Sequence, residues 1–195
     1  MQEFERIMVI HGPSIELIVD NPTELKLVDK GAHGAVFKLH DNKCIKIYAE
    51  NINAELEAAS YRKGQASEII PRIFEAGENY IIIEFIEGIS LYEYLSKKKN
   101  IDLSITKEML FVLKEMKQLG FTRIDSSLRH ILVTKDERLK AIDLVYAYVR
   151  NDRKPIKIFT ELQSLGLVKP FLEHVKELDI NLYKEWVIDM SDYIL

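Results

Sequence analysis

The chain has 195 residues, of which 47% are hydrophobic and 30% are charged, and its formal net charge is -4. This composition is typical of a globular protein, and the acidic balance argues against a nucleic-acid partner. The single cysteine fits a reducing compartment, and no apolar run approaches the roughly 18 residues of a membrane span, so we expect a cytoplasmic protein with no membrane partner.

Residues 14–48 are predicted to form an antiparallel meander of strands. Gly31 and Gly34 bracket a tight turn between two apolar stretches, as glycine often does where the chain must turn sharply. A further strand over residues 44–48 carries Lys46 between two isoleucines. Taken alone, the glycines can form a plain turn, and Lys46 can simply point to solvent from an amphipathic strand.

Residues 50–64 are predicted to form a helix. Its predicted apolar face comprises Ile52, Leu56 and Ala59, with Glu55 beside them. Residues 69–74 contain Pro71 and therefore predict a connector or an edge strand, because proline is excluded from central strands. Residues 80–85 are strongly apolar and predict a strand that is buried on both faces.

After Gly88 the sequence changes from predicted strands to predicted helices. Ser90 can cap a helix that reaches about Lys99, residues 104–119 form the most regular helical pattern, and the stretch from Pro155 onward is mostly helical. A strand-rich part followed by a helical part predicts an α+β protein with two lobes. The predicted lobes are residues 1–86 and 87–195.

Two carboxylates flank a predicted hairpin in the helical part. Asp125 lies in a polar loop before an apolar strand at residues 131–133, and Asp143 follows a second short strand at residues 139–142. Because a hairpin brings its two ends together, the two carboxylates should face one cleft.

The spacing of Asp125, His130 and Asp143 resembles that of the catalytic and metal-binding loops of the protein kinase superfamily, in which the middle residue is asparagine. The segment from Gly31 to Val36 is similar to the glycine-rich loop of that family. The resemblance covers about residues 24–150 and looks closest to small atypical bacterial and archaeal kinase-like proteins. It implies a bilobal protein-kinase-like fold, with an antiparallel β-sheet in the N-lobe and a reduced, mostly helical C-lobe.

The resemblance implies a nucleotide site in the N-lobe. Lys46 would pair with phosphates of ATP and be oriented by a glutamate of the following helix. Glu55 is the preferred partner, because Ala58 and Ala59 leave a small apolar inner face, and Glu57 is the alternative. The other implied ATP-binding positions are Gly31, Gly34 and Val36 in the glycine turn, and Glu84 and Ile86 in a hinge-like segment.

The resemblance implies catalysis and metal binding in the C-lobe. Asp125 would accept or orient the substrate hydroxyl, while Asp143 and His130 would hold Mg²⁺ or Mn²⁺. His130 is a departure from the family, since an amide oxygen suits Mg²⁺ and an imidazole suits Mn²⁺ or Zn²⁺ better. Alternatively, His130 only holds the loop in shape through a hydrogen bond to Asp125 or to the backbone.

Other departures concern the activation-loop switch, the metal-binding triplet and the protein-substrate platform. Ile124 stands where the family usually has arginine, the Asp-Phe-Gly triplet reads Asp-Leu-Val, and no Ala-Pro-Glu sequence follows. We therefore expect an atypical ATP-dependent kinase that transfers the γ-phosphate to a protein Ser/Thr or to a small-molecule hydroxyl. One alternative is a catalytically impaired kinase-like module (a pseudokinase) that binds nucleotide or regulates a partner, and another is an unrelated α+β protein.

Overall fold

The computed structural model describes residues 2–14, 16–40, 42–152, 154–189 and 191. The chain divides into two compact units, one made of Met1–Ala66 and Ile70–Ile86 and the other of Ser67–Ile69 and Glu87–Leu195. The first unit is rich in strands and the second is rich in helices. Their assignment as the N-lobe and C-lobe of a kinase stays a prediction.

The first unit is built on antiparallel strands and one long helix. A five-stranded sheet has the order β3-β4-β5-β7-β6, and β1 and β2 form a separate hairpin. The elements are η1 (Glu3–Arg6), β1 (Met8–His11), β2 (Leu17–Asp20), β3 (Leu27–Lys30), β4 (Gly34–Lys38), β5 (Lys43–Tyr48), α1 (Asn51–Gly64), β6 (Ile73–Ala76) and β7 (Tyr80–Glu84). The predicted edge strand after Pro71 is confirmed as β6, which ends the sheet.

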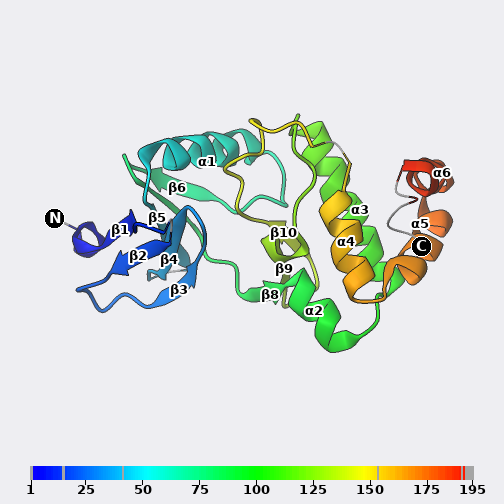
Figure 1. Ribbon diagram of the computed structural model, residues 1–195, viewed down its shortest axis with the longest axis horizontal. Coiled ribbons are helices and arrows are strands. Elements are labelled where there is room, and N and C mark those ends of the chain that lie inside the picture. Colours follow the sequence, from blue (N-terminus) through cyan, green and yellow to red (C-terminus); the bar gives the residue numbers. More distant parts are fainter. Residues whose placement is uncertain (1, 15, 41, 153, 190, 192–195) are drawn as a thin grey trace. The chain divides into compact units, whose positions relative to one another are not determined.

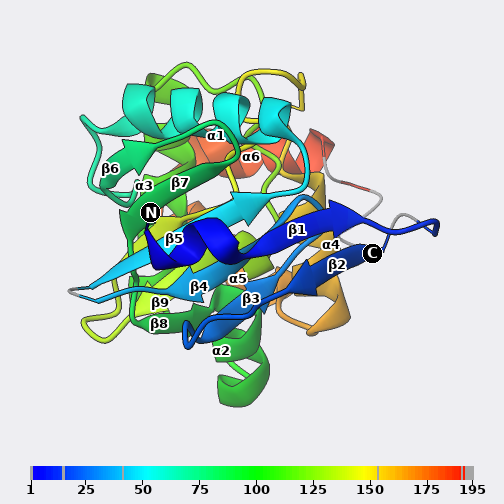
Figure 2. The ribbon, with the colours of Figure 1, turned by 90° about the vertical axis from the view of Figure 1, so that its left-hand side faces the viewer.

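The two faces of β5 have different neighbours. Because side chains alternate along a strand, Ile45 and Ile47 point to one face while Lys46 and Tyr48 point to the other. Ile45 and Ile47 are buried in a core that includes Val9 of the N-terminal hairpin, and this hairpin can be followed in Figure 2. Helix α1 contacts β5, β6 and β7, and Figure 1 shows it running alongside β6.

The apolar face predicted for α1 is wrong. Ile52 is 52% exposed and Ala59 is also exposed. The buried residues of the helix are Asn53, Ala54, Glu57, Ala58, Ser60, Tyr61 and Gly64. The helix packs on the face of β5 that carries Lys46 and Tyr48, so most of the residues that face the sheet are small or polar.

The second unit combines a small sheet with helices. Its three-stranded antiparallel sheet has the order β10-β9-β8. The elements are β8 (Gly88–Ser90), α2 (Leu91–Lys98), α3 (Leu103–Gln118), η2 (Leu128–His130), β9 (Ile131–Thr134), β10 (Leu139–Ala141), α4 (Ile156–Ser164), α5 (Val168–Leu178) and α6 (Ile180–Asp189). The predicted hairpin is confirmed as β9 and β10, and the two predicted helices after Gly88 are confirmed as α2 and α3.

Helix α5 is central to the packing of the C-terminal helices, since it contacts α3, α4 and α6. Phe171 of α5 stacks on Trp186 of α6, with ring centroids 5.8 Å apart. Phe159 of α4 meets both rings edge to face, an arrangement that aromatic pairs favour. Residues 192–195, which fall in the predicted C-terminal helical stretch, lie outside the described residues.

The short segment Ser67–Ile69 belongs to the second unit although it lies between α1 and β6 in the sequence. The Ser67 hydroxyl donates to Glu115 Oε2 of α3 at 2.5 Å. The carbonyl oxygen of Ile69 accepts the N–H of Ala141 at 2.8 Å, at β10. The chain therefore passes from one unit to the other at three points.

The predicted class is confirmed: the protein is a mixed α+β chain in which an N-terminal antiparallel sheet is followed by helices. The bilobal arrangement of a kinase stays a prediction. Within the described residues, no helix combines the length and the apolar character that crossing a bilayer requires.

The two glycines of the predicted glycine turn should respond differently to alanine. A Cβ at Gly34 would collide with the carbonyl oxygen of Ile47, whereas a Cβ at Gly31 would lie 3.9 Å from its nearest neighbour. Gly34→Ala should lower the free energy of unfolding by about 1–3 kcal/mol, and Gly31→Ala should change it by less than about 0.5 kcal/mol. Urea unfolding followed by circular dichroism measures both, and equal losses would contradict the close strand approach at Gly34.

Candidate active site

Lys46, Tyr48 and Glu57 form a polar cluster in the first unit. The Lys46 ammonium donates a hydrogen bond to Glu57 Oε2 at 2.7 Å, and the Tyr48 hydroxyl donates to the same oxygen at 2.7 Å. Glu57 is fully buried, and the Lys46 side chain is 12% exposed. The two donors offset the cost of removing a carboxylate from water.

The cluster is positioned by β5 and α1. Lys46 and Tyr48 are two residues apart on a strand and so share a face, and Glu57 lies on the buried side of the helix that covers this face. A buried ion pair is often no more stabilising than apolar residues of the same volume. Its presence therefore favours a role other than stability, namely holding the Lys46 ammonium in a fixed position.

The preference for Glu55 as the partner of Lys46 is wrong, and Glu57 takes this place. Glu55 is exposed. It lies two positions before Glu57, and side chains two positions apart on a helix point in directions about 160° apart. Ala54 and Tyr61, each about one turn from Glu57, share its buried face. Tyr61, one turn after Glu57, was the signal in the sequence that favoured the second glutamate.

The glycine turn lies next to Lys46 along the sheet. The N–H of Gly31 donates to the carbonyl oxygen of Gly34 at 3.0 Å and closes the turn. Gly34 begins β4, and Val36 on this strand is the register partner of Lys46 on β5. The turn and the lysine thus belong to adjoining strands, while phosphate binding by the turn stays a prediction.

Glu84 and Ile86 end the first unit. The Glu84 side chain accepts the N–H of Arg72 at 3.1 Å through Oε2, which joins the end of β7 to the chain entering β6. Ile86 is the last residue of the unit. Binding of an adenine ring by this segment stays a prediction.

In the second unit, Asp125 is buried before η2 and is 8% exposed. Its Oδ1 accepts the backbone N–H of Lys157 at 2.6 Å, in the first turn of α4, where unpaired N–H groups favour a carboxylate. Burial raises the pKa of the Asp125 carboxyl above its ordinary value, against the opposing effect of the Lys157 hydrogen bond. A raised pKa suits a group that takes up a proton during a reaction.

Glu161 of α4 also holds the segment that follows Asp125. Its Oε1 accepts the Ser127 hydroxyl at 2.7 Å, and its Oε2 accepts the N–H of Leu128 at 2.6 Å. Glu161 is not among the site residues that the sequence predicts. The available signal was an acidic residue within the amphipathic pattern of Ile156–Ser164.

His130 and Asp143 lie together at the open end of the hairpin. His130 Nδ1 is 3.4 Å from Asp143 Oδ2, and the N–H of Ile142 donates to the His130 carbonyl oxygen at 2.9 Å. Asp143 has a φ of 59°, a left-handed conformation that is uncommon outside glycine and clusters at functional sites. Asp125, His130 and Asp143 line one small hollow of the second unit, so the two carboxylates face the same space.

The donor set fits a divalent ion only in part. Across the described ranges of the chain, no three side chains of His, Cys, Asp or Glu gather into a metal centre. Asp143 and His130 are about one third exposed and offer one carboxylate and one imidazole. Such a pair could hold Mg²⁺ or Mn²⁺ together with phosphate oxygens and water, as magnesium sites in phosphate-binding proteins usually do.

Comparison with known proteins gives one similarity that bears on the function. No protein-family model matches the chain. It is 27% identical over 132 residues to "Putative serine/threonine-protein kinase YrzF" of Bacillus subtilis strain 168, a match that covers 65% of this chain and 61% of that protein. The chain is a distant homologue of a kinase-like protein. This homology indicates the kinase-like superfamily that the order of motifs predicts.

The two glutamates of α1 allow a matched test of the Lys46 cluster. Glu57→Gln removes the charge that Lys46 and Tyr48 face in a buried position, and should lower the free energy of unfolding by about 1–3 kcal/mol. Glu55→Gln changes an exposed side chain and should have an effect below about 0.5 kcal/mol. Urea unfolding of both variants is the measurement, and a larger loss for Glu55→Gln would show that the helix face is misassigned.

Asp125→Asn should change stability in a pH-dependent way. Because burial raises the folded-state pKa, the contribution of this carboxyl is present below its unfolded pKa, near about 3.9, and is lost as pH rises through the folded pKa. The amide mimics the neutral acid and can still accept the Lys157 N–H. Relative to the wild type, the variant should therefore gain stability between about pH 3 and 7; urea midpoints that keep a constant difference across this range would refute the assignment.

Proposed function

We propose that the protein is an atypical ATP-dependent kinase that transfers the γ-phosphate of ATP to a hydroxyl of a protein Ser/Thr or of a small molecule. The observation that carries the proposal is the Lys46–Glu57 pair, in which a buried carboxylate fixes a lysine on a strand next to a glycine turn. The distant homology to a protein named as a putative Ser/Thr kinase supports it.

Each unit contributes residues with a distinct role. In the first unit, Lys46 neutralises phosphate charge and Glu57 holds its ammonium in place. In the second unit, Asp125 orients the substrate hydroxyl and takes up its proton. Asp143 and His130 would hold a divalent ion, which would supply further neutralisation of phosphate charge. The protein's task in phosphoryl transfer is mainly positioning and charge stabilisation.

The segment between Asp143 and α4 bears on the substrate. It is short, since α4 begins at Ile156, and it is tied back by the N–H of Asp152 donating to the Thr122 carbonyl oxygen at 3.0 Å. A segment of this length leaves little surface for the extended contact that protein substrates need. This favours a small-molecule hydroxyl or a protein substrate that docks elsewhere.

A second candidate function is a nucleotide-binding module without transfer activity. His130 favours it, because an imidazole stands where the resemblance expects an amide oxygen, and its Nδ1 lies 3.4 Å from the carboxylate of Asp143. Such a module would bind ATP without turning it over. Binding and transfer must therefore be measured separately.

Binding and transfer should separate between the two aspartates. ATP with Mg²⁺ or Mn²⁺ at about 100 times its dissociation constant should stabilise the protein by roughly 2.7 kcal/mol, or on the order of 5–10 °C in melting temperature. Lys46→Ala should remove most of this shift. With γ-labelled ATP, Asp125→Asn should lower transfer by about 10²–10⁴-fold and keep the shift, whereas Asp143→Asn should lose both.

Glu55→Gln serves as the matched control, because it changes a carboxylate on the same helix as Glu57 but on the exposed side. A wild type that binds ATP without transferring label would identify the module. The absence of any thermal shift at millimolar ATP and metal would exclude both functions.

A further inference from the structure

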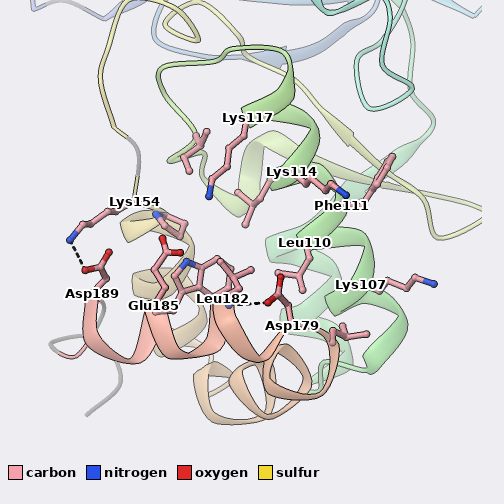
Figure 3. A pocket seen from close by; sticks show the side chains of 15 residues that line it. Lys107, Leu110, Phe111, Lys114, Lys117, Lys154, Asp179, Leu182, Glu185 and Asp189 are labelled. Carbon is pink, nitrogen blue, oxygen red and sulfur yellow. Dashed lines mark hydrogen bonds and ion pairs between the residues drawn. The ribbon is translucent and has the colours of Figure 1, made fainter.

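The proposed function does not use a groove between α3 and α6 of the second unit, which has a volume of about 460 Å³ (Figure 3). Its apolar lining includes Leu110, Leu113, Ile124, Leu182 and Trp186. This volume is within the range of about 300–1,000 Å³ that is common for ligand sites. We call this feature the α3–α6 groove.

The α3 side of the groove carries unpaired positive charge. Lys107, Lys114 and Lys117 line it and are exposed, and none of them forms an ion pair or a side-chain hydrogen bond within the part of the chain that the structure describes. Figure 3 shows Lys117 extending from α3 on the side of α6. From Lys107 to Lys117 the helix rises by about 15 Å, so the three charges form a row rather than one point.

Two of the three acidic groups on the opposite side are already engaged. Asp179 Oδ1 accepts the N–H groups of Asn181 and Leu182 at 3.1 and 2.9 Å and caps α6. Asp189 pairs with Lys154 at 3.1 Å, as drawn in Figure 3. The third acidic group is Glu185, which is exposed. Within the described residues, none of the three carboxylates pairs with a lysine of the α3 row, so this edge of the groove favours an occupant with negative charge.

We propose that the α3–α6 groove docks an amphipathic helix of a partner protein, with its apolar stripe on the half-buried Leu110 and Leu182 and its carboxylates along Lys107, Lys114 and Lys117. A groove between two helices with an apolar floor is a recurrent docking site for such helices. A single anionic head group could not reach three lysines spread over about 15 Å, whereas acidic residues repeating along a helix could. This site is separate from phosphoryl transfer and does not depend on it.

The groove lies directly behind the segment that carries Asp125. Ile124 lines the groove, while its neighbours Arg123 and Asp125 line the hollow that holds Asp143. The side chain of Ile124 thus lies on the groove side of this segment, and those of Arg123 and Asp125 lie on the side of the hollow. The docked helix would therefore pack against the reverse side of the candidate catalytic segment.

Trp186 is a reporter for the groove, because it is the single tryptophan of the chain and its buried side chain forms part of the lining. The probe is a designed peptide of about 14 residues with leucines at i, i+3, i+4 and i+7 and glutamates along one edge; its twin has lysine in place of each glutamate. Titration of the full chain, without ATP, should change Trp186 emission saturably with the glutamate peptide. The lysine twin should bind at least about tenfold more weakly.

Charge reversal tests the lysine row. The double variant Lys114→Glu with Lys117→Glu should weaken the glutamate peptide at least about tenfold and favour the lysine twin, provided that its melting curve shows a folded protein. Lys169→Glu is the matched control, because Lys169 is exposed on α5 and does not line the groove; it should leave both affinities unchanged.

Three results would overturn the proposal: equal binding of the two peptides, no change in emission at millimolar peptide, or saturable binding of laurate without peptide binding. If the double variant does not fold, Lys107→Glu alone replaces it, and an unchanged preference for the glutamate peptide then counts against the docking site. Since no nucleotide is present, a negative result leaves the kinase proposal untouched, and a failed kinase assay leaves the docking result untouched.

Discussion

The burial of one carboxylate determines how the first unit is arranged. The carboxylate of Glu57 is buried and cannot be hydrated, so it needs hydrogen-bond donors from within the protein. Lys46 and Tyr48 of β5 supply them. The helix must therefore turn its small and polar side toward the sheet, which leaves Ile52 exposed. The apolar packing of the sheet is supplied instead on its other face, by the N-terminal hairpin.

Helix α4 has the corresponding role in the second unit. The N–H of Lys157 and the carboxylate of Glu161, four residues later, both bind the segment from Asp125 to Leu128. Residues four apart on a helix lie on one face, so one side of α4 holds this segment at two places. In each unit a helix fixes a candidate functional residue through a buried carboxylate. In the first unit the carboxylate is Glu57 on α1, which holds Lys46, and in the second unit it is that of Asp125 itself, which is held by α4.

The sequence predicted the parts of the fold that depend on local patterns. The hairpin before Asp143, the edge strand after Pro71 and helix α3 all follow from periodicity or from turn residues, and the structure has them. The choice between Glu55 and Glu57 could not be made in this way. The buried face of α1 is polar, so an apolar stripe gives no information about it.

Glu161 was missed for a different reason. It accepts the N–H of Leu128 from 33 residues away, and a contact between distant segments leaves no periodic trace in a single sequence. The order of glycine turn, lysine, glutamate and aspartates did indicate the kinase-like superfamily. The order of motifs along a chain can be recognised even where individual residues within the motifs differ. The roles of these residues follow only from contacts that folding creates.

The segment Ser67–Ile69 has a consequence for dissecting the protein. A fragment that stops at Ile86 would carry this segment with it, so that Glu115 would lose the Ser67 hydroxyl and the N–H of Ala141 would lose the Ile69 carbonyl. The fragment that begins at Glu87 would then lack the segment that packs against α3 and β10. A single proteolytic cut after Ile86 would leave two pieces that still share these hydrogen bonds, and such pieces are suited to reassembly by fragment complementation.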